Sequence, residues 1–78
     1  MQHYNYTILL KNDDNIDAII FTNTRTDVIQ KAILDATDKW YAEQISDSQL
    51  DYIIDYLYEK FDNIYIKDMY MGYDEIYY

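Results

Sequence analysis

The chain has no cysteine and no proline, and it contains a single glycine, Gly72. The absence of cysteine excludes disulfides, thiol catalysis and thiolate metal sites. Because neither proline nor glycine clusters anywhere, no flexible linker is expected to divide the chain. We therefore expect one domain over residues 1–78, near the lower size limit at which a hydrophobic core stabilises a fold unaided.

Long apolar runs are also missing from the sequence. No stretch reaches the roughly 18 consecutive apolar residues of a membrane-spanning helix. The first residues, Met1–Asn5, have neither the basic nor the apolar region of a signal peptide. Basic residues are few, and a formal net charge of −9 would repel both anionic membranes and nucleic acid phosphates. We expect no binding to membranes and no direct binding to nucleic acid.

Acidic residues and tyrosines are abundant instead. The chain has 15 Asp and Glu residues against 6 Lys and Arg residues, and it has 11 tyrosines. Both the acidic excess and the tyrosines are concentrated from Trp40 onwards. Ordinary solvated surfaces mix both signs of charge. A one-signed surface with interleaved tyrosines predicts a binding surface for a basic partner, because charge steers the encounter and aromatic rings supply contact area.

Three segments have the composition of β-strands. The first is Tyr4–Leu10 and the second is Asp17–Thr22, and the short polar turn between them favours an antiparallel hairpin. A third strand is expected at Ile64–Lys67, with room to extend through Met71. The final residues, 73–78, either pair as a further strand or stay mobile.

Two segments between these strands have helical periodicity. Thr24 is expected to cap the first helix, which runs to about Ala42. Ser46 and Gln49 match a capping box for the second helix, which is expected to end near residues 61–62. The order β-β-α-α-β, with room for one more strand, indicates an α+β fold, a small two-layer domain with an antiparallel sheet and two helices. One core is expected to contain Ile8, Leu10, Ile19, Phe21, Ile29, Ile33, Trp40, Leu50, Ile54, Leu57 and Phe61.

Five carboxylates of the second predicted helix fall within a sector of about 120°, roughly opposite its apolar stripe. Tyr52 stands at the edge of this predicted acidic ladder. Like charges four residues apart cost a few tenths of a kcal/mol per pair. One interpretation is a plain solvated face, and the other is a row of charges that imitates phosphates. The ladder consists of Asp47, Asp51, Asp55, Glu59 and Asp62.

The C-terminal stretch has more tyrosines than one small core can bury with every hydroxyl hydrogen-bonded. Part of this richness follows from composition alone, and some rings are expected to pack on the sheet. The remainder, next to carboxylates, is typical of an interface. We therefore add to the ladder and Tyr52 a second group of candidate partner-binding residues: Asp68, Tyr70, Tyr73, Asp74 and Glu75.

No residue pattern indicates catalysis or a cofactor. Asp13, Asn15 and Asp17 fit the first ligand positions of a calcium loop, but Ala18 and Thr24 stand where such a loop needs Gly and Glu. The single histidine has no cluster of metal ligands or catalytic partners in the sequence. No phosphate-binding glycine loop or nucleophile motif occurs either. We expect a protein that is not an enzyme and that binds neither cofactor nor metal.

This sequence resembles the small acidic anti-defence proteins of phages and other mobile elements, notably the DNA-mimicking anti-CRISPR proteins. The resemblance lies in the size, the α+β order, the net charge of −9, the lack of cysteine and proline, and the acidic ladder with neighbouring tyrosines. It implies an inhibitor in the cytoplasm of a bacterial host that occupies a basic DNA-reading site on a CRISPR effector. Carboxylates would pair with Arg and Lys there, and inhibition would be competitive.

Two alternatives stay open. The first is mimicry of DNA against a restriction enzyme or a repressor. The second is a small acidic partner or structural protein of a mobile element, which self-associates through its tyrosine-rich strand. Salt separates these hypotheses, because screening weakens DNA mimicry but not aromatic or strand-mediated self-association. The sequence is compatible with a monomer or a homodimer.

Overall fold

The computed structural model describes residues 3–69. Its elements follow in the order β1 (Tyr6–Asn12), β2 (Asn15–Thr22), α1 (Thr26–Ala42), α2 (Gln49–Lys60) and β3 (Ile64–Asp68). This order confirms the predicted α+β fold with two helices and an antiparallel sheet. The third strand ends at Asp68, so the expected extension does not include Met69; its remainder and the expected further strand lie outside the described residues. Neither α1 nor α2 is long and apolar enough to cross a membrane.

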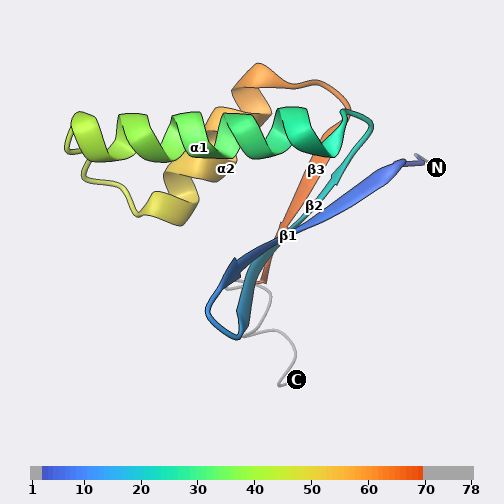
Figure 1. Cartoon of the computed structure of the whole chain (residues 1–78), viewed down its shortest axis with the longest axis horizontal. Coiled ribbons are helices and arrows are strands. Elements are labelled where there is room, and N and C mark those ends of the chain that lie inside the picture. Colours follow the sequence, from blue (N-terminus) through green and yellow to red (C-terminus); the bar gives the residue numbers. More distant parts are fainter. Residues whose placement is uncertain (1–2, 70–78) are drawn as a thin grey trace.

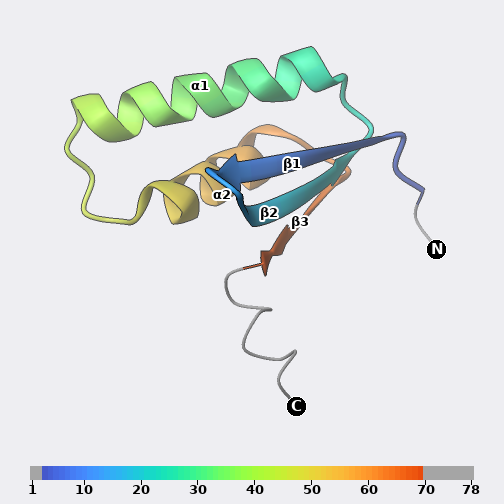
Figure 2. The ribbon, with the colours of Figure 1, turned by 60° about the horizontal axis from the view of Figure 1, so that its bottom comes forward.

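The three strands form one antiparallel sheet with β2 in the middle and β1 and β3 at its edges. A two-residue turn, Asp13-Asp14, joins β1 to β2, and Asp13 adopts a φ of 56° that aspartate tolerates better than most residues. A register shift after Leu10 marks a β-bulge near this turn. Both helices lie on the same side of the sheet, so the molecule has two layers (Figures 1 and 2).

The core lies between the sheet and the helices. Ile8, Ile20 and Ile66 are partners across the three strands and form a buried row on the helix-facing side. Leu57 of α2 is fully buried in the same cluster. The predicted core is confirmed for Ile8, Ile29 and Leu57, which are buried, and for five residues packed against them: Leu10, Ile33, Leu50, Ile54 and Phe61.

The predicted phase of β2 is wrong. Ala18, Ile20 and Thr22 are fully buried, whereas Ile19 and Phe21 point to the opposite face of the sheet. Because apolar residues occupy both faces of β2, alternation alone did not fix which face is covered. Thr22 is tolerated in the core because its hydroxyl accepts a hydrogen bond from the Thr24 N–H at 3.0 Å. Among the other predicted core residues, Trp40 is half-buried and lies outside the core cluster.

Both predicted helix caps are displaced by one or two residues. Arg25, not Thr24, occupies the N-cap of α1, and its side chain makes no capping hydrogen bond. Ser48, not Ser46, caps α2, and its Oγ accepts a hydrogen bond from the Asp51 N–H at 3.1 Å. The later start of α2 follows from the preceding loop, where the Trp40 indole N–H donates to the Asp47 carbonyl at 2.7 Å. That contact keeps the chain at Asp47 outside the helix.

Tyr58 links α2 to the outer edge of β3. Its hydroxyl accepts a hydrogen bond from the Ile66 N–H at 2.8 Å and donates to the Ile66 carbonyl at 3.2 Å. A single side chain therefore satisfies both backbone groups that an edge residue turns away from its sheet.

We expect Leu57→Ala to lower the free energy of unfolding by about 2–5 kcal/mol, because it leaves a cavity under the sheet. Chemical denaturation followed by circular dichroism measures this change. Leu34→Ala on α1 is the control, because Leu34 is 65% exposed and its loss should change stability by no more than about 0.5 kcal/mol. Equal effects of the two substitutions would contradict the assigned core.

Tyr58→Phe should lower stability by about 1 kcal/mol, because it removes the hydroxyl that Ile66 uses as both donor and acceptor. Hydrogen exchange at the Ile66 amide should become faster. Tyr65→Phe serves as the matched control, since the Tyr65 hydroxyl has no hydrogen-bond partner among residues 3–69. An Ile66 amide equally protected in both variants would show that Tyr58 does not cap the strand.

Candidate acidic interaction surface

Helix α2 places Asp51, Asp55 and Glu59 on one face, and all three side chains are exposed. Successive members stand about 6 Å apart along the helix axis, and the three fall within a sector of about 80°. We call these three residues the acidic row. Within the described part of the chain, no Lys, Arg or His nitrogen lies within 4.0 Å of their carboxylates. The row is therefore an uncompensated line of negative charge.

The predicted ladder is longer than this row. Asp47 and Asp62 are exposed, but both lie outside α2: Asp47 precedes the Ser48 cap, and Asp62 follows Phe61, at which the helix ends. The expectation that they continue the same helical face is wrong, because α2 spans only Gln49–Lys60. They extend the negative charge at the two ends of the helix without sharing its regular spacing.

One flank of the acidic row is aromatic. Tyr52 and Tyr56 are half-buried, with ring centroids 6.2 Å apart. Lys60 lies over the Tyr56 ring, with its Nζ 5.4 Å from the centroid and 3.5 Å from the Tyr56 hydroxyl. This contact holds Lys60, the one lysine of α2, on the aromatic flank, so Lys60 does not neutralise Asp55 or Glu59. Tyr52 has the place expected for it at the edge of the acidic face.

The remaining predicted residues do not join the acidic row. Asp68 ends β3 opposite Ala18, whereas the end of α2 leads into the other end of that strand, at Ile64. Figure 1 shows the length of β3 between these two points. The other four candidates lie outside the described residues: Tyr70, Tyr73, Asp74 and Glu75.

A second surface, which the sequence did not reveal, is the face of the sheet away from the helices. Phe21 stacks on Tyr65, with centroids 6.0 Å apart, and contacts Tyr4 at 6.2 Å. The next row across the strands contains Leu9, Ile19 and Lys67. We call this surface the open sheet face. It is apolar and carries a lysine, so its chemistry differs from that of the acidic row.

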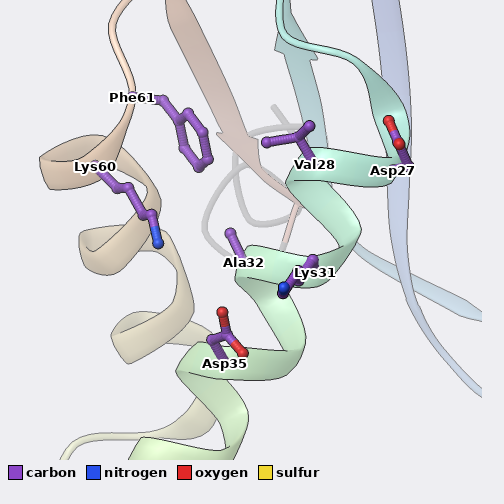
Figure 3. A pocket seen from close by; sticks show the side chains of 7 residues that line it. All are labelled: Asp27, Val28, Lys31, Ala32, Asp35, Lys60 and Phe61. Atoms are coloured by element: carbon purple, nitrogen blue, oxygen red, sulfur yellow. The ribbon is translucent and has the colours of Figure 1, made fainter.

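A hollow lies between the first half of α1 and the end of α2 (Figure 3). Phe61 and Val28 face each other across an apolar floor, and Lys31, Asp35 and Lys60 lie at its rim. Charged groups of both signs therefore surround an apolar floor. The hollow has a volume of about 390 Å³ and is lined by Asp27, Val28, Lys31, Ala32, Asp35, Lys60 and Phe61.

Residues 3–69 contain no group of three His, Cys, Asp or Glu side chains placed to hold a metal ion. The carboxylates are dispersed over the surface of the helices and turns rather than gathered around one point. Comparison of the chain with protein-family models, with curated proteins and with solved structures finds no match.

The acidic row should be nearly neutral for stability except at its first member. Asp51 lies in the first turn of α2, where a negative charge interacts favourably with the helix dipole, so Asp51→Asn should cost about 0.3–1 kcal/mol. Asp55→Asn removes like-charge repulsion on both sides and should raise stability by a few tenths of a kcal/mol. Thermal unfolding of the two variants at low salt measures both signs. If Asp55→Asn proved less stable than wild type, this assignment would be contradicted.

Proposed function

We propose that this protein is a non-enzymatic inhibitor that presents α2 as a mimic of DNA to a basic nucleic-acid-binding protein. The observation that carries the proposal is the acidic row, three exposed carboxylates at regular spacing with no cation within ion-pair distance in residues 3–69. Stability alone favours an acid at Asp51, in the first turn, but would favour a basic residue at Asp55 or Glu59. The repulsion between neighbouring carboxylates of the row is unfavourable in the isolated chain and is relieved when a cationic surface faces the row.

The spacing of the row is compatible with phosphate contacts. Carboxylates about 6 Å apart along a helix are sparser than the phosphates of one DNA strand, which follow every 3.4 Å or so of axis. Along its axis the row therefore has roughly half the charge density of one DNA strand. Asp47 and Asp62, at the two ends of α2, extend the negative region beyond the helix itself.

The proposed target is a CRISPR effector whose Arg and Lys residues line the site that reads target DNA. Those side chains are positioned for anionic oxygens and can pair with carboxylates in the same places. Tyr52 borders the row and supplies contact area beside the charges. A restriction enzyme or a repressor presents the same chemistry, and it is the alternative target within this proposal.

Charge reversal at the end of the row tests the function. Asp55→Lys combined with Glu59→Lys should abolish inhibition, because each lost contact with a desolvated Arg or Lys costs about 2–5 kcal/mol and the new lysines repel the target. Asp51 is left intact because it supports the start of the helix. The measurement is cleavage of target DNA by purified CRISPR effectors and restriction enzymes, with and without the protein. DNA bearing the recognition site should compete with the wild-type protein.

The matched control is Asp38→Lys combined with Glu43→Lys, which makes the same change in net charge at exposed positions of α1 and its C-cap. This control should still inhibit. If the α2 variant folds and inhibits as well as wild type, the acidic row is only a solvated face. Rising salt should weaken inhibition by the wild type, because it screens the charges.

A further inference from the structure

The two edges of the sheet are protected differently. An edge strand presents unpaired N–H and C=O groups, and proteins normally cover them, interrupt them with bulges, or place charged residues or proline there. On β3, the Tyr58 hydroxyl takes both backbone groups of Ile66. The strand that bears Tyr65, β3, is therefore capped at Ile66, which disfavours self-association through it.

The hydrogen bonds of Tyr58 also fix which groups β1 turns outward. Ile66 points its backbone groups away from β2, so its partner Ile20 must point its own groups toward β1 and pair with Ile8. Backbone direction alternates along an antiparallel strand, so Thr7 and Leu9 direct their N–H and C=O groups away from the sheet. No capping group contacts these backbone atoms among residues 3–69.

The sequence of β1 leaves this edge unprotected over most of its length. Lys11 and the register shift, where Asp17 of β2 is the extra residue, occur only at the C-terminal end of β1. From Tyr6 to Leu10 the strand has no charge, and the side chains of Tyr6 and Leu9 are 37% and 45% exposed. A strand with open backbone groups and exposed apolar side chains on both faces can accept another strand.

The distribution of charge indicates which strand can pair with the edge of β1. Each of the other four elements contains at least one carboxylate, whereas β1 contains none. A chain with a net charge of −9 repels its own copies, and this repulsion is smallest where β1 meets β1. No part of the Tyr6–Leu10 edge offers a basic or acidic group to select a charged partner strand.

We propose that β1 pairs with β1 of a second copy, antiparallel and about a two-fold axis, to form a continuous six-stranded sheet. Thr7 and Leu9 occupy the hydrogen-bonded positions. The axis therefore lies midway between the two copies of Ile8 or the two copies of Leu9. Residues directly opposite in an antiparallel pair point to the same face. Both helical layers then lie on one side, and the open sheet faces of the two copies join on the other. This interface is independent of the function proposed for α2.

Sedimentation of the full chain over a concentration series tests the proposal. We expect a monomer–dimer equilibrium, with slower hydrogen exchange at the Thr7 and Leu9 amides as concentration rises. Leu9→Lys places two lysines close together across the axis and should raise the dissociation constant by about tenfold or more. Leu34→Lys, at an exposed position of α1, is the control and should leave the equilibrium unchanged.

Thr7→Pro removes an outward N–H without breaking a bond to β2, so it should also weaken the dimer while leaving the monomer folded. Salt should strengthen the dimer, because it screens repulsion between two acidic chains, which is opposite to its effect on binding of α2 to a basic target. A monomer at every concentration overturns the proposal, as does a dimer unaffected by both substitutions. Concentration-dependent protection at the Ile64 amide, which the same alternation turns outward from β3, instead of at Thr7 and Leu9 overturns it too.

Discussion

The burial of one face of β2 is the constraint on which the rest of the structure depends. Ala18, Ile20 and Thr22 have no exposed surface because β1 and β3 flank the strand and both helices cover it. Within residues 3–69, both helices cover one side of the sheet and no helix or strand covers the other. The other side, the strand edges and the outer faces of the helices therefore all remain at the surface, and each has a different chemistry.

The order of the elements and the phase of both helices could be predicted from the sequence. Leu57 and Ile29 occupy the buried stripes that helical periodicity assigned to them. The phase of β2 could not be predicted, because Ile19 and Phe21 are as apolar as Ile20 and only the position of the helices distinguishes the two faces. The start of α2 depends on a side-chain contact in the preceding loop, the hydrogen bond from Trp40 to the Asp47 carbonyl, which local capping rules do not include.

The candidate site was predictable to the same extent as the helix that carries it. Asp51, Asp55 and Glu59 share a face because the period of a helix requires it. Asp47 and Asp62 were misplaced because the ends of α2 were misplaced, so an error of two residues in the cap removed part of the predicted ladder. The role of Tyr58 was not visible in the sequence, where it was one of several tyrosines. Only the approach of β3 to α2 makes its hydroxyl a cap.

Carboxylates and open backbone groups occupy different parts of the surface. The helices and turns carry most of the carboxylates of residues 3–69, and β1 carries none. Where carboxylates are dense, another copy of the chain is repelled and a cationic molecule is attracted. Where they are missing, apolar contact and backbone pairing operate without that penalty. Segregation of charge from the edge strand would therefore keep the two proposed contacts apart, because a partner suited to the acidic row is not suited to the edge of β1.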